Sequence, residues 1–158
     1  MNISKLLTDN RLKITTAESC TGGLIAKILT DTCGASAYFD MGFVVYSNEA
    51  KVKLLGVDQQ TLNTYGAVSL EVAKQMAIGA LDVSGADVAI SVTGIAGPSG
   101  GSLQKPVGLV FIGVSGLYGT KAERFMFRGT RDEIRQAAAL EALLMASNYI
   151  ELHYNNDH

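Results

Sequence analysis

The stretch Asp87-Val88-Ala89-Ile90-Ser91-Val92 decides the fold, because this short β-branched run leads directly into the glycine-rich residues 93–102. A short apolar run that ends in turn residues is typical of a buried strand. On both sides of it, further short apolar runs alternate with longer stretches of helical periodicity, which is the pattern of an α/β domain. The sequence therefore predicts one domain over residues 1–158: an α/β/α sandwich, with a mixed sheet and helices on both faces.

Glycines and capping residues set the expected limits of these elements. We expect Asn48 and Ser69 to cap helices at their N-termini, and Gly34 and Gly56 to end helices. The segments between residues 57 and 68 read as short and polar, and residues 153–158 as a frayed end. The expected strands are 12–17, 42–46, 87–92, 107–114 and 122–127, and the expected helices are 3–8, 21–33, 48–55, 69–83 and 131–150.

Composition narrows the class of function. The chain has 158 residues, 13 basic against 15 acidic, and its net charge of -2 includes no basic block, so we expect no nucleic-acid partner. Cys20 and Cys33 form no CxxC pair and lack nearby histidines, so we expect reduced thiols and no metal. The N-terminus is polar and no apolar run has the length of a membrane span, so we expect a cytoplasmic protein with a small-molecule ligand.

The segment TAESCTGG, residues 16–23, is the first candidate for chemistry, because a predicted strand ends there and a helix is expected to begin. Ser19 at such a junction would be a nucleophile whose developing oxyanion is stabilised by backbone N–H groups, for which we name those of Thr21 and Gly22. The alternative is that Ser19 or Thr21 only caps a helix. Cys20 is expected to point into the core.

The choice of a general base is limited because the only histidines are His153 and His158, near the end of the chain. This placement disfavours a Ser-His-Asp triad. A serine can instead be activated by a desolvated lysine of lowered pKa, oriented or assisted by a tyrosine. Lys51 follows Tyr46 across a predicted strand-to-helix turn, and both side chains are expected at the carboxyl edge of the sheet. Lys51 as an ordinary surface lysine is the competing interpretation.

The loop at residues 93–102 is the second candidate, because its small residues leave N–H groups free to surround a phosphate or ribose. It matches neither GxGxxG nor a P-loop, so we expect no ATP–magnesium chemistry. Arg128, Arg131 and Arg135 gather near the last predicted helix, where a guanidinium can pair with a phosphate. Surface ion pairs are the alternative, and we favour them for two of the three.

Together these segments resemble the CinA C-terminal domain family. The resemblance rests on TAESCTGG, GFVVYSNEAKVKLLGV, YGAVS, SVTGIAGPSGG and KPVG, and it spans residues 15–135. It implies hydrolysis of the carboxamide of nicotinamide mononucleotide to nicotinic acid mononucleotide and ammonia, with no cofactor. By the same resemblance, Ser19 matches the family's nucleophile, Tyr46 its catalytic tyrosine and Lys51 its general base.

For the nucleotide portion we assign Thr93, Gly94, Gly97 and Arg131. Many relatives have an acidic residue before the matching arginine, whereas this chain has Thr130. The resemblance also implies a stand-alone domain that forms a homodimer or a higher homo-oligomer. The alternatives are a non-catalytic nucleotide-binding paralogue and an amidase for a related pyridine nucleotide amide.

Overall fold

Five strands form one mixed sheet in the order β2-β1-β3-β4-β5 in the computed structural model, which describes residues 2–154. Strand β1 pairs in parallel with β2 and β3, whereas β4 pairs antiparallel with both β3 and β5. The carboxyl ends of β1, β2 and β3 therefore meet at one edge of the sheet. The strands are β1 (Ile14–Glu18), β2 (Phe43–Val44), β3 (Val88–Gly94), β4 (Leu109–Gly116) and β5 (Gly119–Met126).

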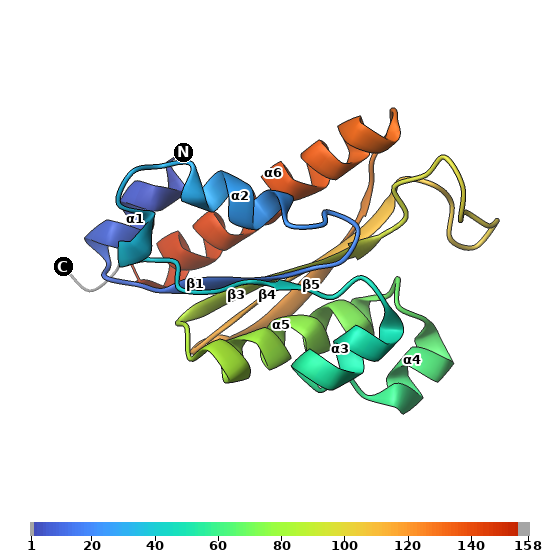
Figure 1. Ribbon diagram of the computed structural model, residues 1–158, viewed down its shortest axis with the longest axis horizontal. Helices are drawn as coiled ribbons and strands as arrows, with labels where there is room; N and C mark the ends of the chain where they lie inside the picture. Colours follow the sequence, from blue (N-terminus) through green and yellow to red (C-terminus); the bar gives the residue numbers. More distant parts are fainter. Residues whose placement is uncertain (1, 155–158) are drawn as a thin grey trace.

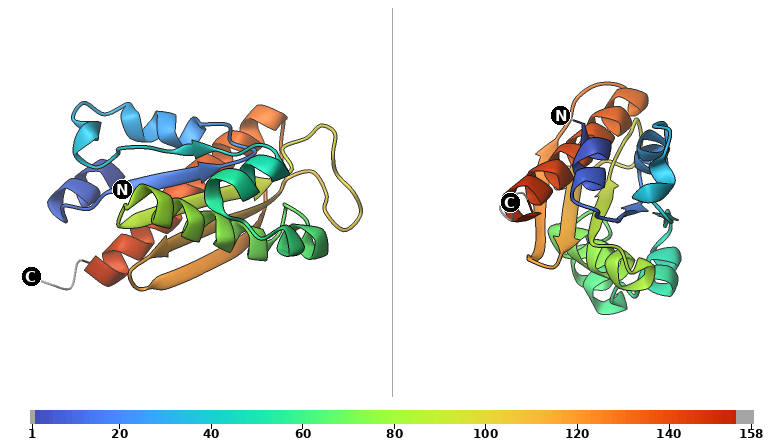
Figure 2. Two further views of the ribbon diagram at one scale, coloured as in Figure 1. Left: turned by 60° about the horizontal axis from the view of Figure 1, so that its bottom comes forward. Right: turned by 90° about the vertical axis from the view of Figure 1, so that its left-hand side faces the viewer.

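Helices cover both faces of this sheet, and the predicted α/β/α sandwich is confirmed (Figure 1). One face carries α1, α2 and α6, and the other carries α3, α4 and α5, as the further views also show (Figure 2). The helices are α1 (Ile3–Asp9), α2 (Leu24–Thr30), α3 (Asn48–Leu55), α4 (Gln59–Tyr65), α5 (Leu70–Ser84) and α6 (Arg131–Tyr154), with a 3-10 turn η1 at Ala35–Ala37. Across residues 2–154, no helix combines the length and apolar character needed to cross a bilayer.

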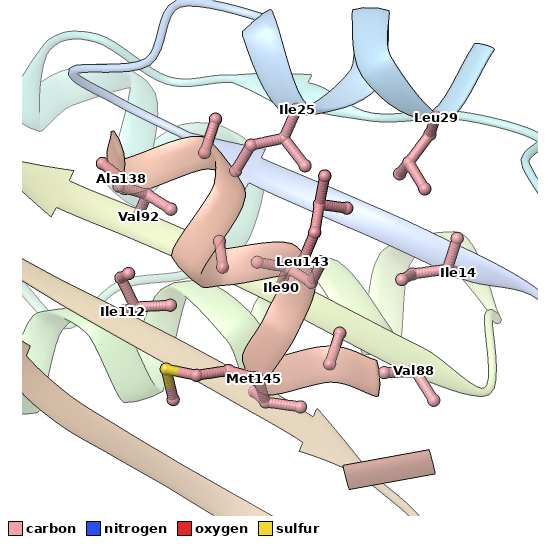
Figure 3. Close-up of a cluster of buried hydrophobic side chains, with 14 of the residues drawn as sticks. Ile14, Ile25, Leu29, Val88, Ile90, Val92, Ile112, Ala138, Leu143 and Met145 are labelled. Carbon is pink, nitrogen blue, oxygen red and sulfur yellow. The ribbon is translucent and has the colours of Figure 1, made fainter. Parts of the chain in front are cut away.

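The alternation of side chains along β3 sends large residues to one face of the sheet and small ones to the other. Val88, Ile90 and Val92 pack under α2 and α6 in the larger core cluster, which Figure 3 shows together with residues of both helices. The opposite face carries Ala89 and Ser91, and the hydroxyl of Ser91 donates to a carbonyl of α5. Small side chains there let α5 lie close against the sheet.

Helix α2 begins later than the sequence predicts, and the reason is the backbone of two glycines. Gly22 and Gly23 have φ values of 59° and 103°, which place them in the left-handed region rather than in a right-handed helix. The helix therefore starts at Leu24, and it ends at Thr30, before the expected stop at Gly34. Gly34 instead precedes the η1 turn.

Other boundaries differ in smaller ways. Ser47, not Asn48, caps α3 by accepting the Ala50 N–H, whereas the predicted ends at Gly56 and Ser69 are confirmed. Helix α4 was not expected. Helix α6 extends to Tyr154, so a frayed end is wrong for residues 153–154, and residues 155–158 lie outside the described part of the chain.

Candidate active site

A cavity of about 220 Å³ opens at the edge where β1, β2 and β3 end. Its charged lining residues in the described part of the chain are Lys51 and Arg131, and no aspartate or glutamate lines it. Six of the predicted site residues therefore lie around one space. The lining consists of Ser19, Cys20, Tyr46, Asn48, Lys51, Ala67, Val68, Thr93, Gly94, Ala96 and Arg131.

Ser19 is held at the end of β1 by main-chain hydrogen bonds on both of its sides. Its N–H donates to the carbonyl of Val92 in β3 at 3.0 Å, which extends the parallel pairing one residue beyond the strand. Its own carbonyl accepts the N–H of Gly22 at 3.1 Å and so closes a tight turn. The serine hydroxyl consequently reaches the cavity from a rigid backbone.

Lys51 is the buried amine beside this hydroxyl. The Lys51 side chain comes from the first turns of α3, is only 1% exposed, and places Nζ 3.1 Å from Oγ of Ser19. Its Nζ also donates to the carbonyls of Val45 at 2.9 Å and Tyr46 at 3.3 Å. Lys51 is therefore not the surface lysine of the competing interpretation.

Burial lowers the pKa of Lys51 from its ordinary value of 10.5, because a buried ammonium loses its hydration. In the neutral amine, two N–H bonds suffice for the two closest carbonyls, those of Val45 and Tyr46, and the remaining lone pair is free for Ser19. No carboxylate forms an ion pair with Lys51 within residues 2–154. The arrangement therefore favours an amine that accepts a proton from the serine.

Cys20 follows Ser19 in the chain, but its side chain is poorly suited to act as a nucleophile. Burial raises the pKa of its thiol to about 11, so the reactive thiolate is scarce at neutral pH. The side chain is 6% exposed and packs in the core cluster while also bordering the cavity. The expectation that Cys20 points into the core is confirmed.

Glu18, which the sequence analysis did not single out, occupies the N-terminus of α2. Its fully buried carboxylate accepts the N–H groups of Ile25 at 2.8 Å and Ala26 at 3.0 Å. A negative charge at this position complements the helix dipole. The N–H groups of Ile25 and Ala26 in the first turn of α2 are thus engaged by Glu18 and are not free to bind an oxyanion.

The turn after Ser19 offers fewer free N–H groups than expected. The N–H of Gly22 is engaged with the Ser19 carbonyl, so its assignment as an oxyanion donor is not supported by this geometry. The N–H groups of Cys20 and Thr21 donate to no backbone oxygen within the described residues. Of the two residues named from the sequence, Thr21 therefore keeps an N–H group without a backbone partner, although this residue is fully buried and does not line the cavity.

Tyr46 and Arg131 meet at the mouth of the cavity. Arg131 donates from Nη2 to the Tyr46 hydroxyl at 3.2 Å and from Nη1 to the Gly97 carbonyl at 2.8 Å. The tyrosine side chain is 63% exposed, and in the described chain its hydroxyl has no hydrogen bond to Ser19 or Lys51. Arg131 thus joins the end of β2, the loop after β3 and the start of α6.

Thr130 has a local role that its difference from relatives did not reveal. Its hydroxyl accepts the N–H of Glu133 at 3.2 Å, and its own N–H donates to the Glu133 carboxylate at 3.4 Å. This reciprocal pair is a capping box at the start of α6. Thr130 therefore fixes the first turn of the helix that carries Arg131.

The remaining predicted binding residues are placed mainly by packing. Thr93 and Gly94 lie in β3 rather than in the loop, and the Thr93 hydroxyl donates to the Ala67 carbonyl at 2.9 Å. A Cβ at Gly94 would come within 2.8 Å of the Leu109 carbonyl, so strand pairing alone requires this glycine. Gly97 has a φ of 76° and is linked to the site only through Arg131.

Several lining residues were missed, and their signals were weak. Asn48 has the sequence position of a helix cap, and Ala67 and Val68 carry no chemical group that marks a site. Within the part of the chain that the structure describes, no group of histidine, cysteine or acidic side chains could hold a metal ion.

The fold and this site define the class of the protein: an α/β domain with a serine–lysine pair at the carboxyl edge of its parallel strands. The sequence model of the CinA C-terminal domain matches residues 1–150. The chain belongs to this family.

Relatives and solved structures agree with this membership. The nicotinamide-nucleotide amidohydrolase PncC of Enterobacter agglomerans is 55% identical over 134 residues, covering 84% of this chain and 82% of that protein. A CinA-like protein of Chlorobium limicola is 53% identical over 154 residues, covering 94% of this chain and 36% of its own length. The crystal structure of competence/damage inducible protein CihA from Agrobacterium tumefaciens superposes with a TM-score of 0.89 at 49% identity, covering 92% of this chain and 91% of that one. The chain spans about a third of the length of several curated relatives.

Proposed function

We propose that this chain is an amidase that converts nicotinamide mononucleotide and water into nicotinic acid mononucleotide and ammonia, a reaction of pyridine nucleotide salvage. The observation that carries the proposal is the 3.1 Å contact between the Ser19 hydroxyl and the buried Lys51 amine. A relative that covers most of this chain is named as a nicotinamide-nucleotide amidohydrolase, which supports the choice of substrate.

The first step is acyl transfer to Ser19. Neutral Lys51 takes the hydroxyl proton while Oγ attacks the amide carbon, and the carbonyl oxygen becomes negative. The N–H groups of Cys20 and Thr21 are the available donors for this oxyanion. Collapse of the intermediate breaks the C–N bond, and the proton held by Lys51 goes to the nitrogen, which leaves as ammonia.

The second step regenerates the enzyme. Lys51 is neutral again, and it removes a proton from a water molecule that attacks the ester carbonyl of the acyl-enzyme. The ester bond to Ser19 breaks, and the proton returns from Lys51 to Oγ while the nucleotide leaves as the acid. One lysine thus acts as base and acid in turn, which its pKa, lowered by burial, favours.

The charge of the site supports an anionic substrate. Arg131 lines the cavity and no carboxylate does, so a nucleotide phosphate meets the positive charge of this guanidinium and no negative side chain. The cavity volume of about 220 Å³ suits the pyridine carboxamide and part of the ribose, with the phosphate at the mouth beside Arg131. Thr93 and Gly94 form the wall on the β3 side in this proposal, and Gly97 holds Arg131 through its carbonyl.

Tyr46 has two roles in the proposal. Its carbonyl accepts a hydrogen bond from Nζ of Lys51 and holds the amine in place. Its hydroxyl, which contacts Arg131, lies on the side where the substrate enters. We propose that the tyrosine also assists proton transfer, the role that the family resemblance implies for it.

Ammonia release from a panel of amides tests this function. The purified full chain is given nicotinamide mononucleotide, nicotinamide, nicotinamide riboside and the dinucleotide in parallel. Release from the mononucleotide alone supports the proposal, and release from another member of the panel supports the related-amide alternative. Binding of the mononucleotide without release from any of them would instead identify a non-catalytic nucleotide-binding protein.

We also propose a cytoplasmic protein that assembles into a homodimer or higher homo-oligomer. The unpaired cysteines Cys20 and Cys33 are consistent with a reducing compartment. Light scattering at several protein concentrations measures the subunit number.

A further inference from the structure

The side chain of Arg135 binds the turn that follows Ser19, although Arg135 lies more than a hundred residues further along the sequence. From α6, its Nε donates to the carbonyl of Cys20 at 3.0 Å and its Nη2 to the carbonyl of Thr21 at 3.1 Å. No acidic side chain within residues 2–154 forms an ion pair with it. Its charge is therefore directed at two successive peptide groups rather than at a carboxylate.

Arg135 does not line the cavity, so any effect on the reaction passes through the turn. A planar trans peptide points its N–H away from its C=O. The guanidinium that fixes the Cys20 carbonyl therefore also fixes the Thr21 N–H, which points away from Arg135. On the next peptide, the Thr21 carbonyl is held by Arg135 and the Gly22 N–H by the carbonyl of Ser19.

These hydrogen bonds hold the 19–22 turn at both of its ends. Gly22 adopts a φ of 59°, and a Cβ there would lie 3.1 Å from Nη2 of Arg135, so the guanidinium packs directly against the glycine. The peptides between Ser19 and Gly22 have little freedom to rotate under these contacts. The N–H groups of Cys20 and Thr21, which donate to no backbone oxygen within residues 2–154, consequently have fixed directions.

We infer that Arg135 is a positioning residue for acyl transfer: it holds the 19–22 turn so that Ser19 stays within reach of Lys51 and the Cys20 and Thr21 N–H groups stay available to the oxyanion. This inference rests on Ser19 being the nucleophile of the proposed function. An arginine suits the task because its planar fork reaches two acceptors at once, whereas a lysine has a single donor centre. A preorganised donor acts mainly on the transition state, so the turnover rate depends on Arg135 and substrate affinity does not.

The test compares Arg135→Lys and Arg135→Ala with the wild type and with Arg124→Ala, an exposed arginine on β5 that serves as the control. Two reactions are measured on each protein. The first is ammonia release from nicotinamide mononucleotide, which gives kcat and KM. The second is acylation of Ser19 by p-nitrophenyl acetate, followed as a burst of p-nitrophenolate and located by mass spectrometry. Melting temperatures and free guanidinium as a rescue agent complete the set.

We expect both Arg135 variants to lose about 10- to 100-fold in kcat and in the acylation rate, with KM near that of the wild type. Added guanidinium should restore part of the activity of Arg135→Ala and leave Arg124→Ala unchanged. If Arg135→Ala fails to fold, Arg135→Lys decides, because it keeps the charge and the packing volume. Wild-type kcat in a folded variant, or a rise in KM alone, would overturn the inference.

The ester separates this inference from the substrate assignment. Acylation of Ser19 that slows in the Arg135 variants, in a protein that releases no ammonia from the mononucleotide, would support the inference while the proposed substrate fails. Ammonia release at the wild-type rate by Arg135→Ala would overturn the inference and leave the proposed function intact. A wild type that neither reacts at Ser19 nor releases ammonia would overturn both.

Discussion

Nζ of Lys51 lies 3.1 Å from Oγ of Ser19, although 32 residues separate the two in the chain. The parallel strands β1 and β2 produce this contact because both end at the same edge of the sheet. Ser19 directly follows β1, and β2 leads into α3, which carries Lys51. The burial that brings them together also removes water from the amine and lowers its pKa. The fold therefore both places Lys51 beside Ser19 and lowers the pKa of the lysine amine.

Replacing Lys51 by methionine should remove the proposed general base while a side chain still fills its place in the site. We expect Lys51→Met to lower kcat by about 10²- to 10⁴-fold, the range for loss of a positioned acid–base group. The exposed Lys53 on the same helix provides a matched control, and Lys53→Met should keep wild-type kcat. Steady-state ammonia release decides, and near-normal turnover by Lys51→Met would remove Lys51 from the mechanism.

The lowered pKa of Lys51 also predicts how stability changes with pH. Between the folded pKa and the unfolded value of 10.5, the unfolded chain binds one proton more than the folded chain, so stability rises with pH. Lys51→Met lacks this term. Its melting temperature relative to the wild type should therefore fall as the pH is raised from 7 toward 10, whereas Lys53→Met should show a constant difference. A constant difference for Lys51→Met would mean that the amine is charged in the folded protein.

We expect the buried carboxylate of Glu18 to contribute to the stability of the folded protein. Glu18→Gln keeps one oxygen but sets an NH₂ group against an N–H of α2, and hydrogen bonds to a charged acceptor contribute about 1.5–3 kcal/mol each. We expect a loss of about 2 kcal/mol in the free energy of unfolding. Urea denaturation measures it beside Glu49→Gln, an exposed glutamate in the first turn of α3. Equal stabilities of the two variants would show that the carboxylate charge contributes nothing.

Gly79 controls how closely α3 approaches α5. A Cβ at Gly79 would overlap the Leu55 carbonyl oxygen, so Gly79→Ala must push α3 and its Lys51 away from the sheet. We expect a loss of about 1–3 kcal/mol in stability together with a lower kcat. Ile78→Ala, at an exposed position of the same helix, is the control for both readouts. A stable and fully active Gly79→Ala would show that the position of α3 is not critical.

We expect Arg131 to distinguish a ligand that carries a phosphate from one that does not. Without its guanidinium, Arg131→Gln should bind the mononucleotide about tenfold more weakly, since a charge-assisted hydrogen bond contributes about 1.5–3 kcal/mol. Its affinity for the riboside, which carries no phosphate, should not change. Titration of both ligands against Arg131→Gln and the exposed control Arg128→Gln tests this. Equal losses for the two ligands would assign Arg131 to the sugar or to the loop at Gly97 instead.

Most strands and helices could be predicted from the sequence because their apolar periodicity survives in the folded chain, as in β3 and α5. Helix α4 escaped prediction because its sequence QQTLNTY buries Leu62 alone and otherwise reads as a polar loop. The start of α2 was misplaced because a glycine pair is compatible with both a turn and a helix. Local pattern cannot decide between them when the φ angles depend on contacts with α6.

The site residues likewise divide into those that the local sequence pattern indicates and those whose roles depend on tertiary contacts. Ser19, Tyr46, Lys51 and Arg131 were predictable because each carries a reactive or charged group beside a strand end or helix start. Glu18 was not, because its partners are amide groups of a helix whose start was itself misplaced. The engagement of Gly22 with the Ser19 carbonyl could not be foreseen either, because it depends on backbone directions that residue types do not encode.

Ammonia release from nicotinamide mononucleotide by the wild type and by Ser19→Ala tests the central claim most directly. The account predicts release by the wild type and a drop of about 10⁴-fold or more in the variant, whose circular dichroism spectrum and melting temperature should match those of the wild type. Release at the wild-type rate by a folded Ser19→Ala would contradict the claim that Ser19 is the nucleophile.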